Sequence, residues 1–123
     1  IGLFCSTPMV AVSRKVSRKR MMKMLLTGDS IDAKYAKEVG LINDYYPIAK
    51  LENEVLKLAK NIASKSNLIV KIGKKAFYKQ LEMPLEKAYK YTSEVMTKNM
   101  MTLDAYEGIS AFLEKRTPKW KNK

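Results

Sequence analysis

The sequence predicts a mainly α-helical chain, and three features of its 123 residues carry that prediction. Apolar residues recur at steps of three and four, most clearly within residues 51–62, which is the spacing of one face of an amphipathic helix. Residues that start or stop helices border such stretches, with Asp32 before one and Gly28 after another. Only residues 41–46 favour an extended segment. We therefore expect a series of helices with at most one short strand.

The first two helices are short and end before residue 29. A loop over residues 1–8 ends at Pro8, which suits the first turn of a helix over residues 9–16. Ser17 is expected to cap a second helix, and Gly28 ends that helix because glycine readily adopts left-handed backbone.

The third helix is predicted over residues 32–39. Asp32 can cap its first turn, and the apolar positions inside it lie three apart. Gly40 ends the helix. The apolar residues that follow predict a short strand or an extended link over 41–46.

Four longer helices are predicted after Pro47. Residues 64–67 interrupt the first pair, Pro84 opens the third helix, and Thr102 caps the last one. The tail over residues 117–123 is polar and is expected to fray, except where Trp120 finds a surface. The predicted helices span residues 48–63, 68–81, 84–101 and 102–113.

Methionine is frequent, with eight residues in the chain. Such residues can form an adaptable binding surface, but they more often fill a core. We expect core positions, or positions covered by a partner subunit, for Met21, Met22, Met24, Met100 and Met101.

The charge balance favours an anionic partner. The chain carries 24 Lys and Arg against 12 Asp and Glu, a net charge of +12. Such a surface attracts nucleic acid, anionic lipid, or phosphorylated small molecules such as CoA. The alternative is that the lysines lie on solvated helix faces, since the charges are spread along the chain. Five cations lie close together at positions 14, 15, 18, 19 and 20, and the same two interpretations apply to them.

Composition excludes several classes of site. The chain has no His and one Cys, which excludes Ser-His triads, His-metal sites and cysteine zinc clusters, so no metal ligand is predicted. A nucleophilic Cys5 is not expected without a His to activate it. No apolar run approaches 18 residues, so no membrane span is expected. The chain begins at Ile1 without an initiator Met or a leader pattern, which favours a fragment.

Three motifs in this order resemble the crotonase superfamily, the enoyl-CoA hydratase/isomerase proteins. Residues 24–42 contain a leucine pair, Thr-Gly and a later Gly-Leu, which resemble the family string that follows its active-site helix. Residues 2–8 resemble the loop that leads into that helix. Residues 107–120 resemble the family's C-terminal pattern of Glu-Gly, Ala-Phe, Glu-Lys-Arg, Pro and Trp. The details of 4–8 and 77–81 are similar to one particular branch.

The resemblance implies the fold and assembly of the protein. The chain would be the C-terminal helical and trimerisation region of an α/β crotonase fold, a ClpP-like spiral. Residues 1–47 would form the end of the core next to the active site, and residues 48–123 the helical trimerisation region. The family assembles as homotrimers or hexameric dimers of trimers. A cytoplasmic or mitochondrial matrix location would follow.

The resemblance also implies the activity. Family hydratases add water to 2,3-enoyl-CoA thioesters in fatty-acid metabolism, using two glutamates as acid and base and two backbone N–H groups as an oxyanion site. By this likeness all four groups fall before Ile1, so we predict no catalytic side chain here and an inactive isolated chain. The acyl-CoA is the substrate, and no further cofactor is expected.

Two other functions stay open at this point. Isomerase, thioesterase and decarboxylase reactions share the crotonase scaffold, and the acids that distinguish them are absent from this chain. A basic helical nucleic-acid-binding module is favoured by net charge alone. It lacks a helix-turn-helix signature, and we expect no nucleic acid partner.

Four residues are candidate site positions by the resemblance. The backbone of Ser6 and Thr7 would line the acyl or water pocket, although ordinary capping of the next helix is the alternative. Lys115 would reach the CoA phosphates, a role that suits a cation at a helix end, and plain stabilisation of that helix end is the alternative. Met96 takes the position where the family carries an aromatic near the adenine.

Overall fold

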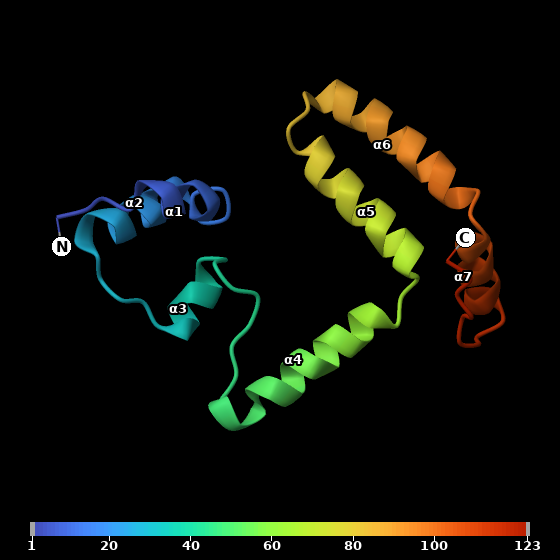
Figure 1. Cartoon of the computed structure of the whole chain (residues 1–123), viewed down its shortest axis with the longest axis horizontal. Helices are drawn as coiled ribbons and strands as arrows, with labels where there is room; N and C mark the ends of the chain where they lie inside the picture. Colours follow the sequence, from blue (N-terminus) through green and yellow to red (C-terminus); the bar gives the residue numbers. More distant parts are fainter. Residues whose placement is uncertain (1, 123) are drawn as a thin grey trace. The chain divides into compact units, whose positions relative to one another are not determined.

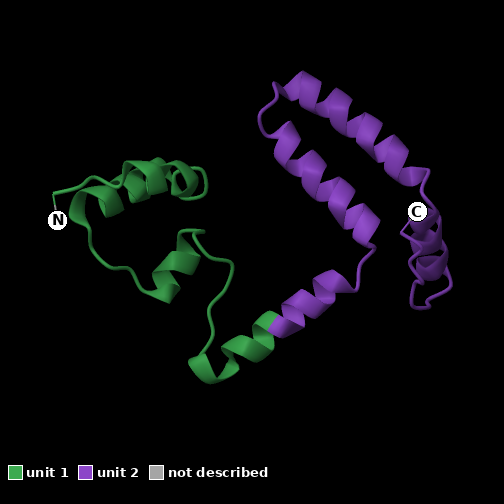
Figure 2. Cartoon of the chain, viewed as in Figure 1, with its two compact units in different colours: residues 1–55 green, residues 56–123 purple. Residues whose placement is uncertain are grey.

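The computed structural model describes residues 2–122, and in that range the chain forms seven α-helices and no strand (Figure 1). The chain divides into two compact units, residues Ile1–Val55 and Leu56–Lys123 (Figure 2). The predicted mainly α-helical class is confirmed. No helix in the described range is long and apolar enough to cross a membrane.

The first unit contains α1 (Ser6–Val12), α2 (Arg18–Thr27), α3 (Ala33–Glu38) and the first half of α4 (Ile48–Ala63). Its buried apolar side chains come from α2, α3 and the residues that follow α1 and α3. These helices are short, so tertiary contact rather than helix propensity stabilises them. The buried side chains are Val16, Met21, Ala36 and Val39.

The glycine and aspartate signals of this unit act as predicted. Gly28 has φ +66°, and its N–H donates to the carbonyl of Met24 to end α2. The Asp32 carboxylate accepts from the N–H of Tyr35 at 2.7 Å and caps α3. Gly40 has φ +77° and ends α3 in the same left-handed way.

Two predictions about this unit are wrong in detail, and a third keeps one of its two alternatives. The first helix begins at Ser6 and ends at Val12 rather than covering 9–16. Pro8 fits inside its first turn because the N–H groups there need no helical partner. Ser17 precedes α2 but its side chain makes no capping hydrogen bond. Residues 41–46 form no strand: residues 41–43 bend and residues 44–46 have no regular structure, which leaves the alternative of a link.

In the second unit, α5 (Asn67–Gln80) and α6 (Leu85–Met100) pack side by side in opposite directions, and α7 (Leu103–Leu113) contacts both (Figure 1). Ala76 and Ala88 are the buried residues of α5 and α6, and such small side chains allow two helices to approach closely. Thr102 caps α7 as predicted, through the N–H of Ala105 at 3.1 Å.

Specific contacts hold the C-terminal tail at residues 119–122. The exception predicted for Trp120 is confirmed, and the expectation that the neighbouring residues fray is wrong for Lys119, Lys121 and Asn122. The Trp120 indole donates to the carbonyl of Ser64 at 2.8 Å. A β-carbon on Gly108 would lie 3.4 Å from two atoms of that ring, so the indole packs directly against Gly108. The Asn122 side chain accepts the first N–H groups of α5, from Asn67 at 3.0 Å. The tail therefore connects the end of α4, the start of α5 and the middle of α7.

Several residues predicted to lie in the core or under a partner subunit are exposed in this chain. Met21 is buried, but Met22, Met100 and Met101 are 50%, 52% and 82% exposed. The apolar face of α4 is open as well, since Val55 is 53% exposed. These side chains are on apolar helix faces that the described residues do not cover.

A first prediction concerns Ser66, which is 3% exposed and caps α5 through the N–H of Ile69 at 3.2 Å. Replacing Ser66→Ala removes this cap and a hydrogen bond to Asp104, so the free energy of unfolding should fall by about 1–2 kcal/mol. Urea denaturation followed by circular dichroism measures the change. The matched control is Ser64→Ala, because Ser64 is exposed and should change stability by less than about 0.5 kcal/mol. Equal effects of the two variants would contradict the assignment.

Candidate functional site

Lys115 lies at the end of α7 in a conformation that a lysine rarely adopts. Its φ is +54°, in the left-handed region. The N–H of Lys115 donates to the carbonyl of Phe112 at 3.2 Å, and the N–H of Arg116 donates to that of Ala111 at 3.0 Å. This pair of bonds is a Schellman motif, and Lys115 takes the position where glycine is normally found. The local conformation is therefore strained by about 1–2 kcal/mol.

The residues on both sides of Lys115 are joined by ion pairs. The Arg116 guanidinium contacts both carboxylate oxygens of Glu107, at 2.6 and 3.1 Å, and reaches Glu114 at 2.6 Å. The Glu107 carboxylate also accepts the N–H of Lys119 at 2.6 Å. These side chains close a compact loop after α7, with Lys115 at its start.

The same contacts shift the ionisation of both partners. The hydrogen bonds from Arg116 and from the Lys119 N–H lower the pKa of Glu107 to about 2. Hydrogen bonds to Glu107 and Glu114 raise the pKa of Arg116 above its ordinary value. Because Arg116 is paired with two carboxylates, it is less available to an anionic ligand at this helix end than the exposed Lys115 is.

Asp104 is the buried polar centre of the second unit, at 1% exposure. Its carboxylate accepts a hydrogen bond from the Ser66 hydroxyl and from the N–H groups of Lys121 at 2.6 Å and Asn122 at 2.9 Å. Burial favours the protonated form, but these three donors outweigh it and lower the pKa of Asp104.

Met96 lines a hollow of about 350 Å³ between α5, α6, α7 and the tail. Its walls are mostly apolar, and the buried Ser66 and Asp104 lie at one side. Lys115 does not line it, so this hollow does not bring the two predicted CoA contacts together. Met96 itself is 59% exposed.

Ser6 and Thr7 are the first two residues of α1. The N–H of Ser6 donates to the carbonyl of Phe4 at 2.7 Å, and the Ser6 hydroxyl donates to the same carbonyl at 3.1 Å. The N-cap position belongs to Cys5, and no side chain caps the helix there. The alternative of ordinary side-chain capping by Ser6 or Thr7 is therefore wrong.

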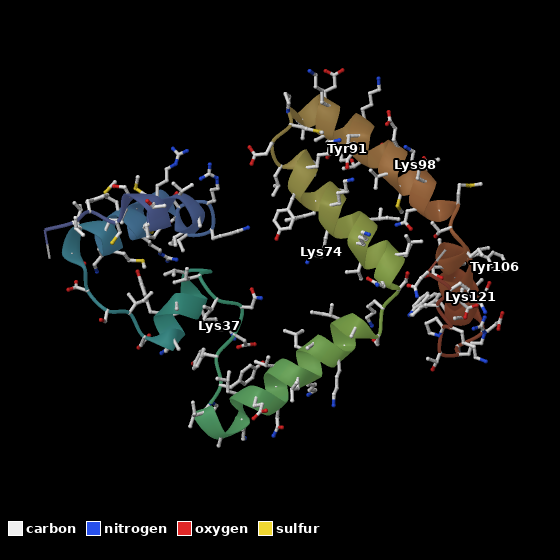
Figure 3. All side chains as sticks on the ribbon, viewed as in Figure 1. Lys37, Lys74, Tyr91, Lys98, Tyr106 and Lys121 are labelled. Atoms are coloured by element: carbon white, nitrogen blue, oxygen red, sulfur yellow. The ribbon has the colours of Figure 1, made fainter. Side chains whose placement is uncertain are left out.

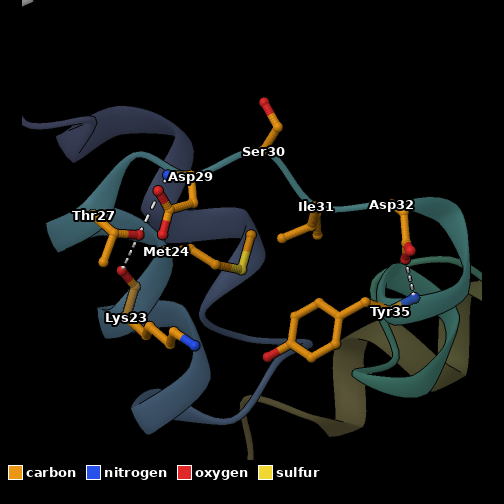
Figure 4. Close-up of a pocket in the computed structure, with 8 residues that line it drawn as sticks. All are labelled: Lys23, Met24, Thr27, Asp29, Ser30, Ile31, Asp32 and Tyr35. Carbon is orange, nitrogen blue, oxygen red and sulfur yellow. Dashed lines mark hydrogen bonds between the residues drawn. The ribbon is translucent and has the colours of Figure 1, made fainter.

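A second hollow of about 350 Å³ lies in the first unit, between α2 and α3 (Figure 4). Lys23 and Tyr35 face it from the two helices, and Asp29 and Ser30 come from the connecting loop. None of the predicted site residues lines this hollow. The hydrogen bonds that Figure 4 draws are local ones: the Thr27 hydroxyl donates to the carbonyl of Lys23, the Asp29 N–H donates to the Thr27 hydroxyl, and the Tyr35 N–H donates to Asp32.

The basic side chains are distributed over many elements. Figure 3 labels lysines on α3, α5, α6 and the tail, at positions 37, 74, 98 and 121. Lys37 is paired with Asp44 at 2.6 Å. In the cluster over residues 14–20, Arg14 and Arg20 donate to the backbone carbonyls of Val10 and Glu38. Across residues 2–122 no group of three or more acidic, His or Cys side chains could hold a metal ion.

Comparison with known proteins identifies the family. A sequence model of the enoyl-CoA hydratase/isomerase family matches residues 1–123. The chain belongs to the enoyl-CoA hydratase/isomerase family.

Relatives of known sequence refine this placement. The chain is 48% identical over 120 residues to the human protein named enoyl-CoA hydratase domain-containing protein 3, mitochondrial, with 98% of this chain and 40% of that protein covered. It is 34% identical over 111 residues to the Pongo abelii protein named enoyl-CoA hydratase, mitochondrial, covering 90% of this chain and 38% of that protein. The branch suggested by residues 4–8 and 77–81 is the domain-containing protein 3 type, and this is confirmed.

Solved structures agree with the sequence relatives. The crystal structure of human enoyl coenzyme A hydratase domain-containing protein 3 matches with a TM-score of 0.92 at 48% identity, over 97% of this chain and 47% of that one. An enoyl-CoA hydratase from Mycobacterium smegmatis matches with a TM-score of 0.93 at 45% identity, over 97% of this chain and 46% of that one. The chain corresponds to the C-terminal helical part of the crotonase fold and spans less than half of the length of these relatives.

The ion pairs around Lys115, from Arg116 to Glu107 and Glu114, were not predicted from the sequence. The motif over residues 107–120 contains Glu107, Glu114 and Arg116, but a motif does not say which residues pair. The spacing offered one usable signal. Glu107 and Arg116 are nine residues apart, across a helix end, where an arginine can turn back onto the last turns of its own helix.

A second prediction follows from the pKa of Glu107. A carboxyl with a usual pKa of 4.5 that is lowered to about 2 in the folded chain stabilises the fold fully above pH 4.5. That contribution should be lost as the pH falls from 4.5 through about 2. Urea midpoints measured across this range should fall less steeply in Glu107→Gln than in the unchanged chain. The same slope in both would contradict the pairing with Arg116.

Proposed function

We propose that this chain is the C-terminal part of an enoyl-CoA hydratase/isomerase-like protein, a lyase of fatty-acid metabolism that acts on acyl-CoA thioesters. In this proposal the chain contributes CoA binding and subunit contacts, and the acid and base residues lie in a preceding part of the protein. The family membership and the coverage of about 40% of relatives such as the human protein support this division.

The proposed CoA role rests on one observation, the exposed position of Lys115 beside a paired Arg116. Lys115 is exposed, it begins the loop after α7, and the neighbouring Arg116 is already paired with Glu107 and Glu114. A lysine that holds a strained backbone conformation in a structured loop is a common sign of a functional constraint. We assign to its ammonium group the contact with the CoA phosphates, where a positive point charge is well suited.

The remaining predicted contacts fit the same proposal less directly. Met96 would offer a soft apolar contact to the adenine, from an exposed position on α6. Thr7 would offer its backbone N–H to the acyl or water pocket. The Ser6 N–H already donates to Phe4, so Ser6 would contribute only its position in the loop.

The assembly we propose is a homotrimer or a dimer of trimers. Its support is the large apolar surface that the described residues leave open. On α4 this surface includes Leu51, Val55, Leu58 and Ile62, which are 40–54% exposed. Met101 and Phe112, each 82% exposed, lie after α6 and on α7. A mitochondrial matrix location is supported by the relatives whose names include "mitochondrial".

A third prediction tests the division of labour. The 123-residue chain alone should give no measurable hydration of crotonyl-CoA, because the acid, base and oxyanion groups are expected elsewhere. Loss of the absorbance of the conjugated thioester measures the reaction. The complete protein that contains this chain is the positive control. Turnover by the isolated chain would contradict the proposal.

A fourth prediction tests the CoA contact of Lys115 in the complete protein. Lys115→Met should raise the Kd for CoA about tenfold, as expected for the loss of one charged hydrogen bond of about 1.5 kcal/mol. Isothermal titration calorimetry measures the Kd. Lys98→Met is the matched control, because it removes the same charge from an exposed position on α6 and should leave the Kd unchanged.

A glycine at position 115 separates binding from backbone strain. Lys115→Gly should weaken CoA binding as much as the methionine variant does. It should also raise the free energy of unfolding by about 0.5–1 kcal/mol, because glycine adopts the left-handed conformation without strain. If both Lys115 variants bound CoA as tightly as the unchanged protein, Lys115 would have no role in CoA binding.

A further inference from the structure

We propose that Glu107 is a positioning residue that holds Lys115 in place for the CoA phosphates, acting through Arg116. This inference rests on the proposed CoA contact of Lys115 and adds the element that directs it. Glu107 lies one helical turn or more before the end of α7, so it would influence binding without touching the ligand.

Directed contacts of Arg116 hold the chain on either side of Lys115. Arg116 contacts Glu107 through two separate nitrogens, at 2.6 and 3.1 Å, and such two-point contact defines orientation as well as distance. A third nitrogen of Arg116 contacts Glu114 at 2.6 Å. The two neighbours of Lys115 in the chain, Glu114 and Arg116, are thus paired with each other, and Glu107 fixes the guanidinium of Arg116.

The backbone of Lys115 is held in a strained conformation. A non-glycine residue keeps a φ of +54° only where its surroundings enforce that conformation. The loop after Lys115 returns to Glu107 a second time, because the Lys119 N–H donates to the same carboxylate at 2.6 Å. Glu107 therefore closes the loop from both ends, and the left-handed turn at Lys115 is the bend that this closure requires.

The negative charge of Glu107 also affects which cation at this helix end meets an anion. Without Glu107, the Arg116 guanidinium would lose its two-point partner and would compete with Lys115 for any phosphate at this helix end. With Glu107, Arg116 is neutralised and Lys115 makes no ion pair within the described residues. The arrangement selects which of two adjacent cations meets the anion.

The pair is placed for local control more than for stability. The side chains of Arg116 and Glu107 are 37% and 19% exposed, so solvent screens part of the stability that this pair contributes to the fold. The buried contacts of the tail are made by Asp104 instead. Removing Glu107 should therefore loosen the loop around Lys115 while the second unit stays folded.

The test compares two substrates in the complete protein that contains this chain. Glu107→Gln keeps the size of the side chain and removes its charge. It should raise the KM for crotonyl-CoA about three- to tenfold, because a smaller fraction of the protein holds Lys115 in the binding conformation. The KM for crotonyl-pantetheine, which lacks the adenosine and its phosphates, should stay within twofold, and kcat should not change. Glu94→Gln on α6 removes the same charge from an exposed site and is the control.

A double variant separates positioning from a general structural effect. Glu107→Gln combined with Lys115→Met should bind CoA no more weakly than Lys115→Met alone, because Glu107 acts only through Lys115. Amide hydrogen exchange should speed up at residues 114–119 in Glu107→Gln and remain unchanged in α5 and α6.

The outcomes distinguish the inference from the proposed function. Additive effects, equal losses on both substrates, or unchanged exchange at residues 114–119 would overturn the positioning role of Glu107 alone. If Lys115→Met itself left CoA binding unchanged, the proposed CoA contact would fail, and the positioning role with it.

Discussion

The second unit depends on one buried carboxylate. Asp104 accepts hydrogen bonds from the Ser66 hydroxyl and from two N–H groups of the tail, and its 1% exposure means that water cannot replace any of them. Ser66 at the same time caps α5. A single side chain at the start of α7 therefore joins the beginning of α5 to the C-terminal tail, and an unpaired charge at this position would be very costly.

The order imposed by Asp104 reaches the candidate site through the tail. The backbone leaves α7 at Glu114, turns at Lys115 and returns along α7, so that the N–H groups of residues 121 and 122 meet Asp104. The loop is fixed at one end by α7 and at the other by Asp104. The contacts of Glu107 with Arg116 and Lys119 then constrain the short segment between these ends. These two anchors act together with the contacts of Glu107 to Arg116 and Lys119, and the three keep the strained conformation of Lys115 in a surface loop.

Large apolar side chains are exposed on several helices, away from the ion pairs around Lys115. Isolated proteins rarely leave so many large apolar side chains open along α4, α6 and α7. The helix α4 is amphipathic in sequence, yet none of its residues is buried. The described residues leave its apolar face open, and the chain spans only 40% of the human relative.

The sequence by itself determined the helical class, most helix borders and the family, because spacing, caps and glycine stops act over a few neighbouring residues. Asp32, Gly28 and Thr102 behave as their local chemistry predicts. Only the tertiary structure decided the roles of Asp104, Glu107 and the tail. Their partners lie 9 to 56 residues away, and no periodicity encodes which distant groups a side chain will meet. The position of α1 was also decided this way, since a proline in a first turn is compatible with several helix starts.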